Sequence, residues 1–130
     1  MEWRMKAVLD TSVVIATDIG PLEGDLSVSA VTLAELHYGV LVANDDAIRA
    51  ERLRRLTIVQ RAFDPLPVND VVAASYGQMA AALAKMGRSP RPRVMDLLIA
   101  ATAHANGALL YTRNAEDLLG LEEIIEVVSL

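Results

Sequence analysis

The chain has 130 residues, of which 53 % are hydrophobic, so it is long enough for one domain with a sizeable core and too apolar to be disordered. It has no cysteine, which excludes disulfides, zinc–thiolate sites and thiol nucleophiles. No apolar run reaches the roughly 20 residues of a membrane-spanning helix, and the first residues lack the features of a signal peptide, so we expect a cytoplasmic protein without membrane contact.

Apolar runs and helical patterns alternate through the first half of the chain. Glycine and proline at positions 20, 21 and 24 mark a loop, and Asn44 or Asp45 is suited to cap the longest helix. The predicted core residues of that helix are Ile48, Leu53, Leu56 and Val59. The predicted elements are a strand at 6–10, a helical turn at 11–17, a strand at 26–29, and helices at 31–42 and 45–62.

The second half continues this alternation. Pro65 and Pro67 bracket a short extended piece, and Asn69 is suited to cap a helix that Gly87 ends in a left-handed conformation. The remaining predicted elements are the helix at 70–86, a proline-stiffened basic connector at 88–93, a helix at 95–105, a strand at 108–112, a short helix at 115–119 and a strand at 124–127.

Strands separated by helices predict an α/β fold with a mainly parallel sheet that is covered on both faces. In such sheets, ligands bind beyond the carboxyl ends of the strands. Residues that follow different strands are therefore expected to meet in one pocket, however far apart they lie in the sequence.

Four acidic residues stand where this topology would bring them together. Asp10 ends the first strand, Glu35 lies within an otherwise uncharged helical pattern, Asp96 opens a helix, and Asp117 follows the run at 108–112. Carboxylates gathered at one end of a sheet cannot all stay ionised without a cation. An all-oxygen site of this kind suits Mg²⁺, or Mn²⁺ in its place, and a divalent metal held by carboxylates is typical of enzymes that hydrolyse phosphodiesters.

Each acid also has a purely structural interpretation. Asp10 is suited to cap the next helix, and Glu35 fits a capping box with the threonine three residues earlier. Asp96 lies in a first helical turn, where the helix dipole favours an anion, and Asp117 is spaced to complete a cap with Asn114. Taken singly, none of the four is specific, and their joint position near predicted strand ends is the stronger signal.

The net charge of −5 conceals a strong asymmetry. Residues 49–93 contain nine of the twelve basic residues and three acidic ones, so this segment has a net charge of +6. The rest of the chain has three basic and fourteen acidic residues, a net charge of −11. A basic segment beside an acidic site suits a polyanion held by arginines with its phosphate at a metal. The alternative is that the five arginines between positions 49 and 61 form the solvated face of a helix.

At these residues the chain resembles the PIN-domain ribonucleases, and most closely the VapC-type toxins of type II toxin–antitoxin systems. The resemblance covers essentially all 130 residues, which we take as a single PIN domain. The matching segments, in family order, are 8–12, 31–39, 96–103 and 107–117, of which the aspartate before Ile-Ala-Ala and the Thr-Arg-Asn-x-x-Asp motif are the most specific. A departure is Leu118, where many relatives have Phe, and this position should pack rather than react.

The resemblance implies a three-layer αβα fold with a sheet of four to five strands. It makes Asp10, Glu35, Asp96 and Asp117 a catalytic quartet, with Asp10, Asp96 and Asp117 as the ligands of Mg²⁺. It assigns auxiliary hydrogen bonds to Ser12, Thr112 and Asn114. It also implies a homodimer, a VapB-type antitoxin that assembles with the toxin into a larger complex, and a structured RNA target such as tRNA or ribosomal RNA.

These observations support the hypothesis of a metal-dependent endoribonuclease that leaves 5′-phosphate and 3′-hydroxyl ends. Arg88, Arg91 and Arg93 are the predicted contacts to the RNA backbone, because a proline-stiffened loop can present them beside Asp96.

Two alternatives of other classes remain. Asp10 is also suited to act as the nucleophile of a phosphatase or phosphotransferase, although Lys6 and Lys85, the only lysines, are poorly placed to assist it. In a non-catalytic binding module, the acids would hold a partner's arginine, and the helices at 31–42 and 47–62 would form a groove for its amphipathic segment.

Overall fold

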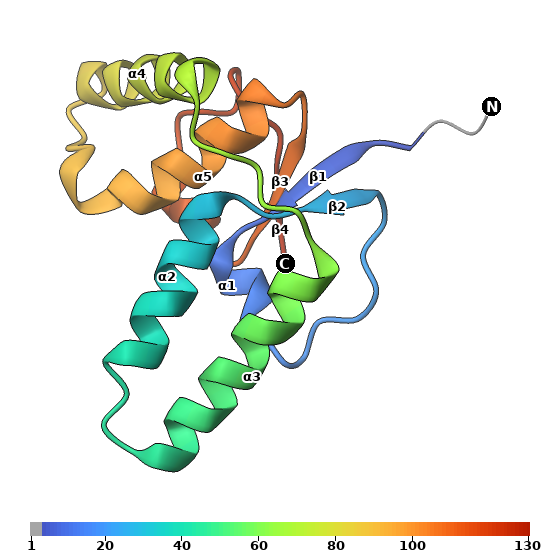
Figure 1. The fold of residues 1–130 in the computed structure, drawn as a ribbon. Coiled ribbons are helices and arrows are strands. Elements are labelled where there is room, and N and C mark those ends of the chain that lie inside the picture. The colour runs from blue at the N-terminus through green and yellow to red at the C-terminus, as the bar shows by residue number, and fades with distance from the viewer. Residues whose placement is uncertain (1–3) are drawn as a thin grey trace.

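Four short strands form one parallel sheet in the middle of the structure (Figure 1), a computed structural model that describes residues 4–130. In spatial order they are β2 (Asp25–Ser27), β1 (Lys6–Leu9), β3 (Leu109–Thr112) and β4 (Val127–Ser129). In register, Val8 pairs with Ser27 of β2 and with Leu110 of β3. All pairs are parallel, as predicted, so the carboxyl ends of the strands share one edge.

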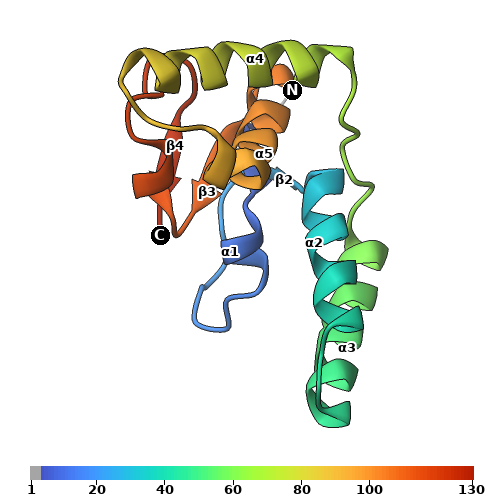
Figure 2. The same cartoon turned by 90° about the vertical axis from the view of Figure 1, so that its left-hand side faces the viewer.

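Within residues 4–130, five α-helices and two 3₁₀ turns connect the strands. The helices are α1 (Thr11–Val14), α2 (Ala30–Leu41), α3 (Asp46–Ala62), α4 (Asp70–Lys85) and α5 (Val94–Ala105), and the turns are η1 (Arg91–Arg93) and η2 (Ala115–Leu118). Figure 2 shows α2 and α3 side by side as a hairpin, here called the α2–α3 arm, that projects away from the sheet, whereas α4 packs on α5. Among residues 4–130, no helix is both long and apolar enough to cross a membrane.

The two faces of the sheet are covered by different helices, which confirms the layered fold. Because successive side chains of a strand point to opposite faces, Val8 and Leu110 pack with α4 and α5, while Leu9 and Tyr111 pack with α1 and the inner ends of α2 and α3. Burying one such aliphatic side chain stabilises the fold by roughly 1.5–3 kcal/mol.

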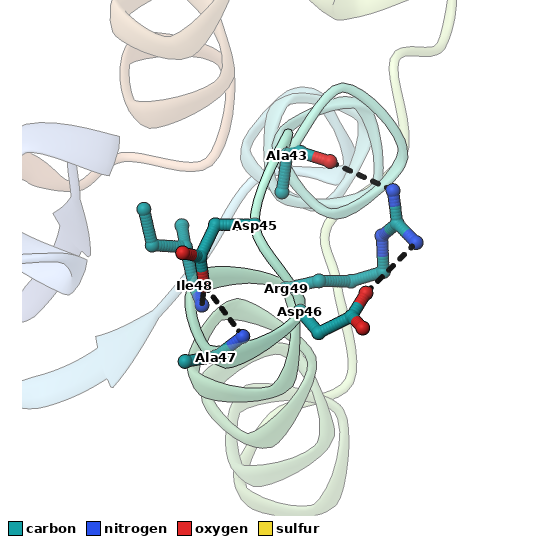
Figure 3. A network of polar contacts seen from close by, with 6 residues as sticks. All are labelled: Ala43, Asp45, Asp46, Ala47, Ile48 and Arg49. Atoms are coloured by element: carbon teal, nitrogen blue, oxygen red, sulfur yellow. Dashed lines mark hydrogen bonds and ion pairs between the residues drawn. The ribbon is translucent and has the colours of Figure 1, made fainter.

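The tip of the α2–α3 arm is fixed by polar contacts at the start of α3 (Figure 3). Of the two predicted caps, Asn44 and Asp45, the structure has Asp45, whose Oδ1 accepts hydrogen bonds from the N–H groups of Ala47 and Ile48 at 2.7 and 3.1 Å. Arg49 donates to the carbonyl of Ala43 at 2.7 Å, which ties α3 back to the end of α2. The caps predicted at Asn69 and the left-handed Gly87 are also confirmed.

Two predictions about apolar residues are wrong. In α3, Leu56 and Val59 are buried, but Ile48 and Leu53 are 47 % and 50 % exposed. The reason is that the first half of α3 lies toward the tip of the α2–α3 arm, away from the sheet. The last strand begins at Val127 rather than at position 124. The two isoleucines before it, residues 124 and 125, lie in a turn, and their N–H groups donate to the carbonyl of Leu121. From this turn their side chains pack into the hydrophobic core.

Candidate active site

Asp10 is the most enclosed of the four acids, with 4 % of its surface exposed. It directly follows β1, and its N–H donates to the carbonyl of Tyr111 at 2.9 Å, which extends the pairing with β3. Asp10 occupies the N-cap position of α1, as the structural interpretation has it, but its side chain makes no capping bond to that helix. Instead, Oδ2 accepts hydrogen bonds from the hydroxyls of Ser12 at 2.6 Å and Thr112 at 2.9 Å.

The two hydroxyls that hold Asp10 are themselves fixed by backbone amides. The N–H of Arg113 donates to Ser12 Oγ at 3.0 Å, and the N–H of Asn114 donates to Thr112 Oγ1 at 3.0 Å. Because each hydroxyl accepts from an amide, its own hydrogen remains for the carboxylate of Asp10. Both bonds end on Oδ2, so Oδ1 is the oxygen of Asp10 that a further ligand can use.

Glu35 is also oriented by a hydroxyl. The capping box proposed for it is wrong, because α2 begins at Ala30 and its cap is Ser29, whose Oγ accepts from the N–H of Val31. Glu35 Oε1 instead accepts from Thr11 Oγ1 at 2.7 Å. Thr11 Oγ1 lies 2.9 Å from Thr32 Oγ1, and since the hydrogen of Thr11 goes to Glu35, the buried Thr32 is the donor to Thr11.

The sequence interpretation missed Thr11 and Thr32 as partners of Glu35. From the sequence, Thr11 is suited to cap the helix after Asp10, and Thr32 is suited to a capping box. The sequence does show that Thr11 is adjacent to Asp10 and that Thr32 lies three positions before Glu35. The hydrogen bond from Thr11 to Glu35, however, joins positions 24 apart, and it depends on how α2 packs beside α1.

Asp96 is the acid whose pKa responds to the charges of the other three. It lies in the first turn of α5, and its pKa is raised from the ordinary value of 3.8 to about 6. Burial is the largest cause, followed by the negative charges of Asp10, Asp117 and Glu35, while the cation of Arg93 opposes the rise. Asp96 therefore lies near enough to each of the other three acids for their charges to act on it, as the topological argument predicts.

Asp117 lies in η2, where its N–H donates to the carbonyl of Asn114 at 3.1 Å. Asn114 makes no side-chain capping bond, so the proposed cap between these two residues is wrong. Asp117 Oδ1 is 3.9 Å from Nε of Arg93, and this buried Nε has no hydrogen-bond partner among the described residues. Arg93 thus brings a positive charge to the edge of the acidic cluster.

The three arginines predicted to contact RNA differ in their surroundings. Arg88 donates to the carbonyls of Glu116 and Leu119, and Arg93 donates from Nη1 to the carbonyl of Ser89 at 2.7 Å. Arg91 is exposed. Their predicted contact with RNA stays a prediction.

The side chains as they stand do not form a closed metal cage. In the described part of the chain, no three acidic or histidine side chains are gathered tightly enough to hold an ion. Mg²⁺ commonly binds proteins through only one or two carboxylates and keeps several waters, so an open, all-carboxylate donor set suits it.

A groove of about 520 Å³ is lined by residues of α1, α2 and α3, and Glu35 is one of them. Ile15, Tyr38 and Val42 give it an apolar wall, and Tyr38 is 68 % exposed. Arg52 and Arg55 line the side formed by α3. The groove therefore combines apolar surface, two cations and a carboxylate of the acidic cluster.

Comparison with known proteins identifies the family of this chain. Residues 7–119 match the family model of the PIN domain. Two ribonucleases of Mycobacterium tuberculosis are similar: VapC5 is 40 % identical, with 92 % of this chain and 94 % of that protein aligned, and VapC8 is 37 % identical, with 74 % and 88 % aligned. The solved structure of VapBC-5, a toxin–antitoxin system of the same organism, matches with a TM-score of 0.85 at 37 % identity over 96 % of this chain and 98 % of that one. The chain belongs to the PIN-domain family and, within it, to the VapC ribonucleases.

Proposed function

We propose that this protein is a Mg²⁺-dependent endoribonuclease toxin that acts in the cytoplasm and is inhibited by a VapB-type antitoxin. The observation that carries the proposal is the gathering of acids at the carboxyl edge of the sheet, where burial first, and then the charges of Asp10, Asp117 and Glu35, raise the pKa of Asp96. The names of its relatives, which are ribonucleases, support the reaction class.

In this proposal, Asp10, Asp96 and Asp117 hold the metal, which Mn²⁺ can replace, and bound Mg²⁺ supplies a more acidic water and neutralises phosphate charge. The hydroxyls of Ser12 and Thr112 fix Asp10 so that Oδ1 is presented in one orientation. Glu35, fixed through Oε1 by Thr11, orients the attacking water with its second oxygen. Attack at phosphorus leaves a 5′-phosphate and a 3′-hydroxyl.

The proposed substrate is structured RNA, either tRNA or ribosomal RNA. The exposed Arg91 precedes α5, the helix that carries Asp96, and is suited to bind a backbone phosphate beside the acidic cluster. A phosphatase reaction with Asp10 as nucleophile has less support. Lys6 opens β1 and so lies at the other end of the strand from Asp10, while Lys85 ends α4.

The proposed inhibitor is an amphipathic antitoxin segment in the groove between α1, α2 and α3. Its apolar side chains would pack on Ile15, Tyr38 and Val42, and its acidic groups would pair with the arginines of α3. A basic side chain at the end of that segment would reach Glu35 and compete with the metal. The solved relative VapBC-5 is a toxin–antitoxin system, which supports such a partner, and we include a homodimeric toxin within a larger complex in the proposal.

The test is cleavage of bulk tRNA and ribosomal RNA by the purified chain with Mg²⁺ or Mn²⁺. Asp10→Asn and Asp96→Asn should each lower cleavage by orders of magnitude while circular dichroism shows an unchanged fold, and EDTA should abolish the activity of the wild type. Fragments should carry 5′-phosphates. A wild-type chain that binds antitoxin but never cleaves RNA would instead support the binding module, and cleavage by both variants at the wild-type rate would refute the assigned site.

A further inference from the structure

We infer that Arg88 is a positioning residue that holds Asp117 in the acidic cluster, rather than a direct contact to RNA. The inference rests on the proposed function, because it concerns the geometry of one proposed metal ligand. It comes from contacts between the end of α4 and η2, two parts of the chain about 30 positions apart.

The guanidinium of Arg88 is committed to the backbone around Asp117. Nη1 donates to the carbonyl of Leu119, and Nη2 donates to the carbonyl of Glu116 at 3.1 Å. These two carbonyls stand on either side of the pair Asp117-Leu118. One planar side chain therefore bridges the segment that carries Asp117, and its rigid fork suits two acceptors at fixed spacing.

The base of this bridge is itself rigid. The N–H of Arg88 donates to the carbonyl of Leu83 at 3.0 Å and that of Gly87 to the carbonyl of Ala84 at 3.0 Å, so the residues after α4 fold back onto its last turn. Gly87 has the left-handed φ of +74° that such a helix end requires. The guanidinium is thus carried by a well-anchored helix end.

The segment that is bridged is weak by itself. η2 is a single 3₁₀ turn, in which the N–H of Leu119 lies 3.5 Å from the carbonyl of Glu116. A turn this short does not persist in isolation, so external contacts must hold it. Leu118, 4 % exposed, anchors it in the core, and Met86 of the same α4 end packs against Gly120. Arg88 supplies the polar part of this attachment.

The test compares three variants in the full chain. Arg88→Met removes the donors at similar length, Lys85→Met removes a charge from the same helix end without touching η2, and Arg91→Met removes an exposed charge of the same connector. The first readout is amide hydrogen exchange of the metal-free protein. Exchange at Asp117 and Leu119 should accelerate in Arg88→Met only, while exchange at Leu110 of β3 stays unchanged.

The second readout is cleavage of bulk tRNA. Arg88→Met should lower kcat by about 10- to 100-fold with little change in KM, as expected for a displaced reactive group. The loss should disappear when Asp117 is already Asn, because two changes acting through one group are not additive. Arg88→Lys, which can still donate to one carbonyl, should recover part of kcat.

The third readout is the salt dependence of tRNA binding, measured with Asp10→Asn in every variant to prevent cleavage. Arg88→Met should leave the slope unchanged, whereas Arg91→Met should reduce it by about 0.7–0.9 for the lost phosphate contact. A reduced slope in Arg88→Met, a raised KM and an undiminished effect beside Asp117→Asn would overturn the inference in favour of RNA contact. Unchanged exchange at Asp117 would overturn it even if the protein cleaved no RNA, so its failure differs from that of the proposed function.

Discussion

Replacing Asp96 with Asn should stabilise the metal-free protein at neutral pH. The pKa of Asp96 is raised from 3.8 to about 6, so the folded state binds its proton more tightly than the unfolded chain does. For an acid shifted in this direction, stability falls as the pH rises from about 4 to about 6, and the full penalty remains above that range. Asparagine keeps a similar shape without the charge and removes this penalty.

The magnitude follows from the two pKa values. A difference of about two pH units for one proton corresponds to about 3 kcal/mol. Asp96 is only partly buried, and solvent screens part of the repulsion, so we expect about 1–2 kcal/mol at pH 7. For a domain of this size, that gain raises Tm by about 3–8 °C.

The assay is thermal unfolding in EDTA between pH 4 and pH 8. The advantage of Asp96→Asn over the wild type should be absent at pH 4 and complete above pH 7, whereas the exposed Asp64→Asn should show no such profile. Added Mg²⁺ should raise the Tm of the wild type by mass action and that of Asp96→Asn much less. An Asp96→Asn protein that is less stable than the wild type at pH 7, or whose stability advantage is the same at pH 4 and pH 8, would show that the ionised Asp96 does not destabilise the fold.

Two further substitutions probe features that the sequence did not reveal. Thr11→Val removes the hydroxyl that holds Glu35 and should lower the rate of RNA cleavage by about 10- to 100-fold. Thr11→Ser keeps the hydroxyl and should cleave nearly as well as the wild type. Equal cleavage rates for the two variants would refute the role of this hydrogen bond. Gly120→Ala should lower the free energy of unfolding in urea by about 1–3 kcal/mol, because φ is +97° and the new Cβ meets Met86. The matched Gly77→Ala, in the open interior of α4, should instead stabilise by about 0.5–1 kcal/mol, and a Gly120→Ala protein as stable as this control would contradict the strain.

The position of the acidic cluster could be predicted from the sequence because it follows from local pattern and topology. Asp10 and Asp117 come after apolar runs that could only be strands in an α/β alternation, and parallel strands align their carboxyl ends. The four-stranded parallel sheet, the caps at Asp45 and Asn69 and the turn at Gly87 rest on equally local rules.

What the sequence did not reveal depends on packing between distant segments. Ile48 and Leu53 have the spacing of core residues, yet the arm carries them beyond the sheet. The bond from Thr11 to Glu35 and those from Arg88 to η2 join residues 24 to 31 positions apart, and no periodicity encodes them. From the sequence alone, Arg88 resembles a ligand for a polyanion, because nothing in the sequence shows that its guanidinium donates to two backbone carbonyls.

The hydrogen bond from Thr112 to Asp10 spans 102 positions and therefore links the beginning of the chain to its last fifth. During synthesis, β1 has no β3 beside it until nearly every codon has been read, and contacts of such long range form late in folding. The carboxylate of Asp10 is thus held in its final orientation only after the polypeptide is almost complete. A translation product that ends before β3 lacks both Thr112 and Asp117, so it cannot assemble the acidic cluster.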